Sequence, residues 1–244
     1  MFLDFRHRIA HNKRRRLFRC EKMSMRDMTP EDTLNGSSLA SHYDRKAEEY
    51  DWRGPEVVFG LSYSFVNPGE SVLDIGIGTG LGSVLFHKAG LHVYGMDIST
   101  EMLEACRSKG FAADLKKHDL TVEPYPYDDA SLDHAVCLGV LNFFKDLHIV
   151  FREVARILRD NGIFTFIVGD RGSGEKAEFV VGREHTQTDS SVTMYRHGTE
   201  EINGLLKDSG FESVRSLEFP VPMDRERTKT LHAKAYVAKR RRRI

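Results

Sequence analysis

Short apolar segments alternate with amphipathic ones through most of this chain. The apolar segments predict buried strands over Ser71–Ile75, His92–Asp97, Ala113–His118, Asp133–Leu138 and Gly162–Val168. The segments between them predict helices over Gly80–Ala89, Thr100–Lys109 and Asp146–Leu158. Strands that alternate with helices in this way indicate a parallel sheet covered on both faces.

The pattern changes after residue 168. The stretch Gly169–Tyr195 is polar, irregular and too long for a simple connection, so we interpret it as a lid or substrate loop. A helix is predicted over Thr199–Gly210, and Glu212–Phe219 and Leu231–Val237 predict an antiparallel hairpin at the sheet edge. The expected fold is α/β, Rossmann-like and doubly wound, with a mostly parallel seven-stranded sheet and this edge hairpin.

The two ends of the chain differ from its middle. Residues 1–38 lack periodicity, are rich in Lys and Arg, and end in a turn-like Asn-Gly-Ser-Ser, which predicts a disordered basic extension. The folded domain is expected over 39–238, beginning with a helix that places Tyr43 and Tyr50 on one face, and a basic tail over 239–244.

Composition narrows the class of protein. The 244 residues, 40% of them hydrophobic, suit one α/β domain. No apolar run reaches the ~20 residues of a membrane span, and the N-terminus has no apolar signal-peptide core. The three cysteines are too scattered for a disulfide framework or a metal site, so a cytoplasmic protein is expected. The basic ends flank an acidic middle, which disfavours nucleic-acid binding by the folded face but leaves contact through the ends open.

A glycine-rich turn carries the most information. Asp74-Ile-Gly-Ile-Gly-Thr-Gly80 leads from a predicted strand into a helix, and glycines here would let a ligand approach bare backbone. The spacing is G-x-G-x-G, and Leu81 occupies the sixth position of a dinucleotide fingerprint, which disfavours a nicotinamide-dependent dehydrogenase. A P-loop is excluded because no Gly-Lys-Ser/Thr follows.

Two acids flank this turn. Asp74 would repel a pyrophosphate but attract an ammonium or a sulfonium, and Asp97, at the end of the next strand, can accept both ribose hydroxyls. S-adenosylmethionine offers both cations and a ribose but no phosphate, so it is the cofactor that these residues favour. The alternative is that Asp74 caps the turn and Asp97 the following helix.

Residues from about 40 to 238 resemble the class I S-adenosylmethionine-dependent methyltransferase superfamily, in particular its branch of ubiquinone/menaquinone-biosynthesis-type small-molecule methyltransferases. The resemblance rests on motifs in the family order: Tyr43-Asp44 and Tyr50-Asp51, Asp74–Gly80, Val93–Ser99 with Met102, His118–Leu120, and Leu138–Leu141. It implies that the acid of the third motif contacts adenine, that backbone of the fourth holds the methionine end, and that the tyrosines cover the cofactor. The implied cofactor-binding residues are Tyr43, Tyr50, Asp74, Gly76, Gly78, Gly80, Asp97, Ile98, Met102, Asp119, Leu120 and Leu138.

The methyl acceptor is less defined. Methyl transfer from a sulfonium is an in-line displacement that depends mainly on alignment, and a base is needed only when the acceptor must lose a proton. Asn142 stands where this branch often has His, so no base is expected at that position. Tyr195 and His197 come just before a predicted helix, at a position that faces the acceptor pocket in related enzymes, and the resemblance makes them the candidate catalytic residues. The alternative for His197 is a solvated residue at the helix start. His134, inside a strand, is interpreted as a packed residue. A small-molecule acceptor is predicted; an RNA methyltransferase recruited through the basic ends and a non-catalytic cofactor-binding protein are the alternatives.

Overall fold

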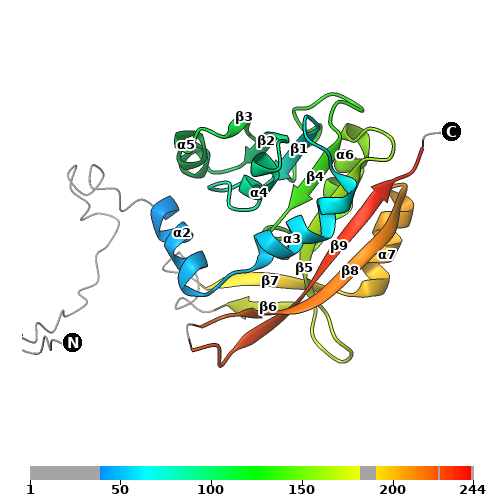
Figure 1. The fold of residues 1–244 in the computed structure, drawn as a ribbon. Coiled ribbons are helices and arrows are strands. Elements are labelled where there is room, and N and C mark those ends of the chain that lie inside the picture. The colour runs from blue at the N-terminus through cyan, green and yellow to red at the C-terminus, as the bar shows by residue number, and fades with distance from the viewer. Residues whose placement is uncertain (1–38, 182–190, 225, 243–244) are drawn as a thin grey trace, which may run out of the picture. The chain divides into compact units, whose positions relative to one another are not determined.

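The computed structural model describes residues 39–181, 191–224 and 226–242 (Figure 1). The helices are α2 (Leu39–Glu49), α3 (Gly54–Ser62), α4 (Val84–Lys88), α5 (Thr100–Ser108), α6 (His148–Ile157) and α7 (Thr199–Asp208), with short 3-10 turns η1 (Tyr63–Phe65) and η2 (Leu141–Phe143). The strands are β1 (Ser71–Ile75), β2 (His92–Asp97), β3 (Ala112–Lys117), β4 (His134–Cys137), β5 (Ile163–Asp170), β6 (Glu178–Val181), β7 (Val192–His197), β8 (Phe211–Pro222) and β9 (Thr230–Arg240).

The sheet has the predicted doubly wound order. Strands run β3-β2-β1-β4-β5-β9-β8, with parallel pairing from β3 to β5 and antiparallel pairing of β9 with β5 and β8. The order reverses between β1 and β4, so the chain crosses from one half of the sheet to the other at this point. Ligands of doubly wound folds bind outside the carboxyl ends of the strands at such a switch point.

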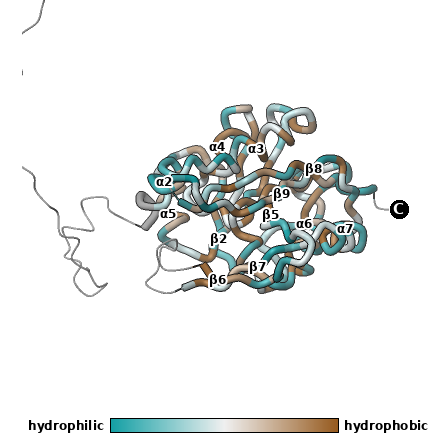
Figure 2. Tube along the Cα trace, turned by 90° about the horizontal axis from the view of Figure 1, so that it is seen from below, coloured by the Kyte–Doolittle hydropathy of each residue, from teal (hydrophilic) through white to brown (hydrophobic). Residues whose placement is uncertain are grey.

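Both faces of the sheet are covered because successive strand residues point in opposite directions. On one face, Leu73 and Phe166 pack with Phe151 of α6 and Leu205 of α7. On the other face, the buried cluster contains Val72, Val58 of α3, Phe86 of α4 and Leu103 of α5. Hydrophilic residues predominate along the traces of α2 and α7 (Figure 2). The hydrophobic core is therefore two layers on either side of one sheet.

The structure differs from the sequence prediction after the glycine turn and after residue 169. The helix expected over Gly80–Ala89 is only α4, because residues 79–83 continue the turn. The stretch expected to be irregular contains the antiparallel hairpin β6–β7, and residues 182–190 lie outside the described part. Gly169 of β5 pairs with β9 on one side and with Arg196 of β7 on the other, so the hairpin joins β5 where β4 has already ended. The seven predicted strands are therefore extended by two.

The C-terminal strand reaches beyond the predicted domain boundary at residue 238. Arg240 pairs with Phe211 of β8, and its backbone exchanges hydrogen bonds with Asn161 and Gly162. The Arg240 guanidinium donates to the carbonyl oxygens of Ala155 and Gly210 at 3.0 and 2.9 Å. Two residues of the expected basic tail are thus part of the sheet. The other expected extension, residues 1–38, lies outside the described residues.

A chain shortened to end at Ala238 should therefore be less stable than one shortened to end at Arg242. The shorter chain loses the ladder pairs of Lys239 and Arg240 and several hydrogen bonds, a loss of about 3 kcal/mol at 0.5–1.5 kcal/mol per bond. Urea unfolding of the two chains measures the difference. Equal midpoints would show that the last strand residues contribute nothing to the fold.

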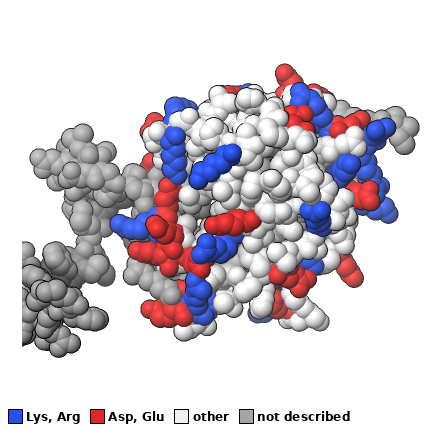
Figure 3. All heavy atoms as spheres, viewed as in Figure 1, with Lys and Arg blue, Asp and Glu red and all other residues white. Residues whose placement is uncertain are grey.

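Charge is mixed over the face that Figure 3 shows, where Lys and Arg side chains lie among Asp and Glu. Within the described residues, no helix is long and apolar enough to cross a membrane.

Candidate functional site

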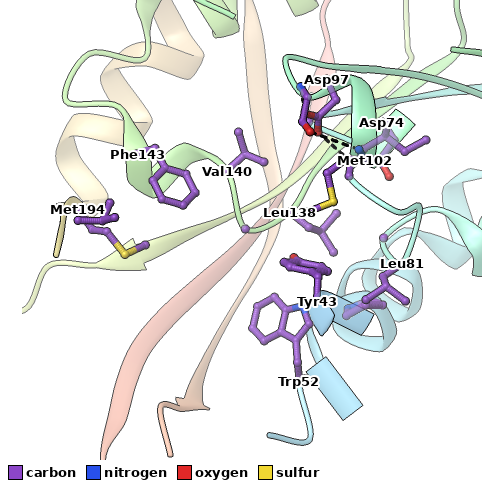
Figure 4. A pocket seen from close by; sticks show the side chains of 18 of the residues that line it. Tyr43, Trp52, Asp74, Leu81, Asp97, Met102, Leu138, Val140, Phe143 and Met194 are labelled. Carbon is purple, nitrogen blue, oxygen red and sulfur yellow. Dashed lines mark hydrogen bonds between the residues drawn. The ribbon is translucent and has the colours of Figure 1, made fainter. Parts of the chain in front are cut away.

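A pocket of about 500 Å³ opens at the carboxyl ends of β1, β2 and β4 (Figure 4). Its lining comes from segments far apart in the sequence: Tyr43, Trp52, Pro55, Asp74, Gly76, Ile77, Gly78, Leu81, Gly82, Asp97, Ser99, Met102, Leu138, Gly139, Val140, Phe143, Val181, Val192, Met194 and Met223. The pocket therefore sits at the switch point of the sheet, and its volume suits a ligand of nucleoside size.

The glycine turn forms the floor of one end of this pocket. Gly76 and Gly78 have φ of 69° and 53°, in the left-handed region that favours glycine. A Cβ on Gly76 would lie 2.4 Å from Val140, so the turn packs tightly against the loop after β4. A Cβ on Gly78 would meet no protein atom within 4 Å. At Gly78, then, bare backbone faces open space that a ligand can occupy.

Asp97 ties the turn to the next strand. Its Oδ2 accepts the Gly78 N–H at 2.9 Å, and its Oδ1 accepts the Ser99 N–H at 2.8 Å. A carboxylate has about four lone-pair positions, so each oxygen can still accept a further hydrogen bond. Asp74 is the penultimate residue of β1 and Asp97 is the last residue of the adjacent parallel strand β2, and both line the pocket, as the sequence predicted.

Asp74 is the least satisfied polar residue of the site. It is 2% exposed, and its Oδ2 has no hydrogen-bond partner among the described residues. Burial raises the pKa of Asp74 to about 7, the Ser83 hydroxyl opposes this rise, and the charge of Asp97 adds to it. Burying an ionised carboxylate without a partner costs free energy. A ligand that places a cation beside Asp74 would remove this cost.

The N-terminal helix is fastened over the glycine turn by Asp44. Its carboxylate accepts the Thr79 hydroxyl, and it forms an ion pair with Lys109 at 2.6 Å. These contacts bring Tyr43 into the pocket wall. Burial, followed by the charges of Asp44, Asp74 and Asp97, raises the pKa of Tyr43, so its hydroxyl stays protonated and its environment is negative.

The other end of the pocket is apolar. In Figure 4, Phe143 and Met194 lie on the side opposite Asp74 and Asp97, with Tyr43 and Trp52 along the lower wall. Val181, Val192 and Met194 of the β6–β7 hairpin line this end, together with Val140, Phe143 and Met223. The stretch that we interpreted as a lid or substrate loop thus contributes a wall of the pocket.

The structure brings together about half of the predicted cofactor-binding residues. Tyr43, Asp74, Gly76, Gly78, Asp97, Met102 and Leu138 line the pocket. The others do not line it: Gly80 approaches Phe111 and Cys106, Leu120 is buried in the core, and Asp119 accepts hydrogen bonds from Thr121. Ile98 is 62% exposed between two lining residues, Asp97 and Ser99. Tyr50, which the resemblance implied as a residue that covers the cofactor, is not among the lining residues, whereas the nearby Trp52 is.

The two candidate catalytic residues lie outside the pocket. His197 is 1% exposed; its Nδ1 is 2.8 Å from Glu201 Oε1 and its Nε2 is 3.1 Å from the Phe144 carbonyl oxygen. Tyr195 lies one residue from Met194 in β7, so its side chain points to the opposite face of the strand. His197 therefore connects β7 to α7 and to the loop after β4, and a role of either residue in catalysis stays a prediction.

Two further polar residues have structural positions. Asn142 accepts the Gly169 N–H through Oδ1 at 2.7 Å and thereby holds the end of β5. His134 is 4% exposed and contacts Glu70 at 2.8 Å, in agreement with its interpretation as a packed residue. Among the described lining residues, the ionisable side chains are thus Asp74, Asp97 and Tyr43.

Sequence reasoning missed most of the apolar wall. Trp52, the single tryptophan of the chain, could have been predicted as a lining residue, because it closely follows the tyrosine motif. Val181, Val192 and Met194 carried none, because their strands are short and lie within a polar stretch.

Comparisons with known proteins agree with this site. The profile of the family described as "Methyltransferase domain" matches residues 73–166. Malonyl-[acyl-carrier protein] O-methyltransferase of Serratia marcescens is 30% identical over 203 residues, which cover 76% of this chain and 77% of that enzyme. Ubiquinone biosynthesis O-methyltransferase of Paracidovorax citrulli is 27% identical over 145 residues, 58% of this chain and 59% of that enzyme, so the chain spans less than two thirds of this second relative.

A solved structure has the same fold. Magnesium protoporphyrin IX methyltransferase from Synechocystis PCC 6803, determined with bound S-adenosylhomocysteine, superposes with a TM-score of 0.59 at 21% identity and covers 86% of this chain and 99% of that chain. The chain belongs to the class I S-adenosylmethionine-dependent methyltransferases. Its site fits this methyl donor, because the unpartnered Asp74 carboxylate can receive the ammonium and the space beside Gly78 can receive the ligand.

Proposed function

We propose that this methyltransferase transfers a methyl group to a small-molecule acceptor by in-line displacement. The observation that carries the proposal is one continuous pocket with an acidic, glycine-lined end and an apolar end. The first end suits the methyl donor and the second suits an acceptor of modest size. The two curated relatives are named for different acceptors, so they support methyl transfer without fixing the acceptor.

The residues of the acidic end have separable roles in this proposal. Asp74 receives the ammonium group of the methionine end, and Asp97 accepts hydrogen bonds from the ribose hydroxyls while it holds the glycine turn. Tyr43 and Met102 close the sides, and the exposed Ile98 lies where the adenine would extend. S-adenosylmethionine supplies a methyl group already activated on a sulfonium sulfur. The protein therefore contributes alignment and exclusion of water, which can supply ~7–11 kcal/mol of the barrier.

The alternatives that involve other classes of protein receive less support. An RNA methyltransferase would need a basic surface for its substrate, whereas the described residues that line the pocket are acids and uncharged, mostly apolar groups, and the face in Figure 3 carries mixed charge. Recruitment through residues 1–38 involves a segment outside the described residues. A non-catalytic cofactor-binding protein is less consistent with the apolar end, which leaves room for a second molecule.

The cofactor placement can be tested at Gly78. Gly78→Ala should weaken binding of S-adenosylhomocysteine at least tenfold, because the new methyl group enters the ligand space beside the turn. Calorimetry measures the affinity. The matched control is Gly110→Ala, which has φ of 71° and equally open space but lies outside the pocket lining.

Both variants place alanine in the left-handed region, at a cost of about 1–2 kcal/mol each. Their melting temperatures should therefore fall by similar amounts, while only the Gly78 variant loses affinity. Equal affinities for the two variants would place the cofactor elsewhere.

A further inference from the structure

Trp52 separates the pocket from a second cavity. The second cavity, of about 770 Å³, is lined by residues of α2, of α4 and of the start of α3. Trp52, Pro55 and Leu81 line both cavities, so they form a partition between them. Figure 4 shows the Trp52 indole next to the Tyr43 ring in the pocket wall. The position of the indole therefore decides how well the pocket is closed on this side.

The Trp52 indole is packed against two elements. It lies on the start of α3, where a Cβ on Gly54 would come within 2.1 Å of the indole. Any residue other than glycine at position 54 would therefore displace the ring. The indole and the Phe219 ring of β8 have centroids 6.5 Å apart. Trp52 thus joins the start of α3 to the β8–β9 hairpin.

The residue before Trp52 has an uncommon backbone conformation. Asp51 has φ of 53°, and its N–H donates to the Glu48 carbonyl oxygen at 3.0 Å. The Trp52 N–H donates to the Ala47 carbonyl oxygen at 2.9 Å. These are the two hydrogen bonds of a Schellman motif at the end of α2, in which glycine is the usual residue at position 51. Aspartate is more strained here than glycine, and what it adds to the turn is a carboxylate.

The Asp51 carboxylate joins the α2–α3 junction to the tip of the β8–β9 hairpin. Its Oδ1 forms an ion pair with Arg53 of the junction, and its Oδ2 forms one with Arg227 of the tip. The tip also reaches the pocket, because Met223 lines it and donates its N–H to the Lys229 carbonyl oxygen at 2.9 Å. The same short tip therefore contacts the pocket and the residue that precedes Trp52.

We propose that Asp51 and Arg227 are positioning residues whose ion pair holds Trp52 in the wall of the methyl-donor pocket. The pair joins two segments that lie 176 positions apart in the chain. When it opens, the α2–α3 junction is released from the hairpin tip, the indole leaves the partition, and water reaches the bound donor through the second cavity. This inference rests on the proposed placement of the methyl donor in this pocket.

Replacing Arg227 tests the ion pair. In the full-length protein, Arg227→Gln should weaken binding of S-adenosylhomocysteine roughly three- to fivefold, the size of effect that an exposed ion pair produces. Arg227→Lys retains the charge and should recover most of the affinity. Calorimetry measures both.

The matched control is Arg215→Gln in β8. The Arg215 guanidinium donates to the Leu61 carbonyl oxygen at 3.1 Å and lies over the Phe65 ring, so it also joins the hairpin to the helices. Its contacts are at the opposite end of α3 from Trp52. This variant should bind S-adenosylhomocysteine with native affinity.

Tryptophan fluorescence reports the position of Trp52 directly, because the chain has a single tryptophan. Acrylamide should quench the emission of ligand-free Arg227→Gln more strongly than that of the native protein or of Arg215→Gln. Salt should act on the native protein in the same direction, since raising it from about 0.1 to about 1 M shortens the screening length from about 10 to about 3 Å. The Arg227→Gln protein, which lacks the ion pair, should respond less.

The inference requires that affinity and quenching change together in Arg227→Gln. A change in only one of them, or in neither, would overturn it. Equal losses in Arg227→Gln and Arg215→Gln would also overturn it, because they would show a general loosening of the hairpin. A native protein that does not bind S-adenosylhomocysteine would instead overturn the proposed function.

Discussion

Asp74→Asn should abolish most cofactor binding and at the same time raise the melting temperature of the ligand-free protein. The Asp74 carboxylate is buried, and its Oδ2 has no hydrogen-bond partner among the described residues. We therefore expect the ammonium group of the ligand to pair with it. Removing one member of a buried charge pair costs about 2–4 kcal/mol, which corresponds to a roughly thirty- to thousandfold loss of affinity. Calorimetry with S-adenosylhomocysteine measures this loss.

The gain in stability follows from the raised pKa of Asp74. With a folded pKa of about 7 and an ordinary value of 3.8, the folded protein binds more protons than the unfolded chain between these pH values. Stability therefore falls as pH rises from about 4 to 7, and the ionised carboxylate destabilises the fold above pH 7. A neutral Asn removes this destabilisation, on the order of 2–4 kcal/mol, which would raise the melting temperature by roughly 5–10 °C at pH 8.

The same variant should show no gain near pH 4, where native Asp74 is already protonated. Asp114→Asn is the matched control, since Asp114 is an exposed acid of β3 outside the pocket lining. It should change neither affinity nor melting temperature. A lower melting temperature for Asp74→Asn at pH 8 would mean that the carboxylate serves the fold rather than the ligand.

Asp97→Ala should weaken cofactor binding by one to two decades and lower the melting temperature as well. Loss of a charged acceptor for two hydroxyls costs about 1.5–3 kcal/mol. The structure adds a second consequence that the sequence did not reveal: the backbone N–H groups of Gly78 and Ser99 lose their acceptor. Turnover at saturating cofactor should change little, because Asp97 lies at the end of the pocket opposite the apolar end that contains Phe143 and Met194.

Asp97→Asn separates these two effects. The amide retains one oxygen that can accept a backbone N–H, so it should recover part of the melting temperature while affinity stays below that of the native protein. Steady-state kinetics below saturating cofactor report the loss of affinity, and melting curves report the loss of the backbone hydrogen bonds. Native affinity in both Asp97 variants would contradict the placement of the ribose.

The sequence predicted the sheet and the acidic end of the site well, for physical reasons. Val72 and Leu73 belong to a strand that is buried on both faces, which gives an apolar run that is easy to recognise. The glycine turn was predictable because Gly76 and Gly78 need φ values that other residues rarely adopt. Both features are local in the chain, so a single sequence contains them.

The apolar end of the site depends on tertiary structure and was not predictable in the same way. The β6–β7 hairpin forms by pairing with the end of β5, although Glu178–Val181 and its neighbours have no clear strand period. Within β7, position parity decides which side chains face the pocket. Met194 faces it and Tyr195 does not, and a shift of one residue would reverse this assignment.

Calorimetric titration of the native protein with S-adenosylhomocysteine and, separately, with NAD tests the central claim most directly. S-adenosylhomocysteine should bind and NAD should not, because the pocket lining carries two acids where a pyrophosphate would need cations. The affinity for S-adenosylhomocysteine should rise roughly tenfold from pH 5.5 to 7, since Asp74 must lose its proton before it can receive the ammonium. Binding of NAD without binding of S-adenosylhomocysteine would contradict the account.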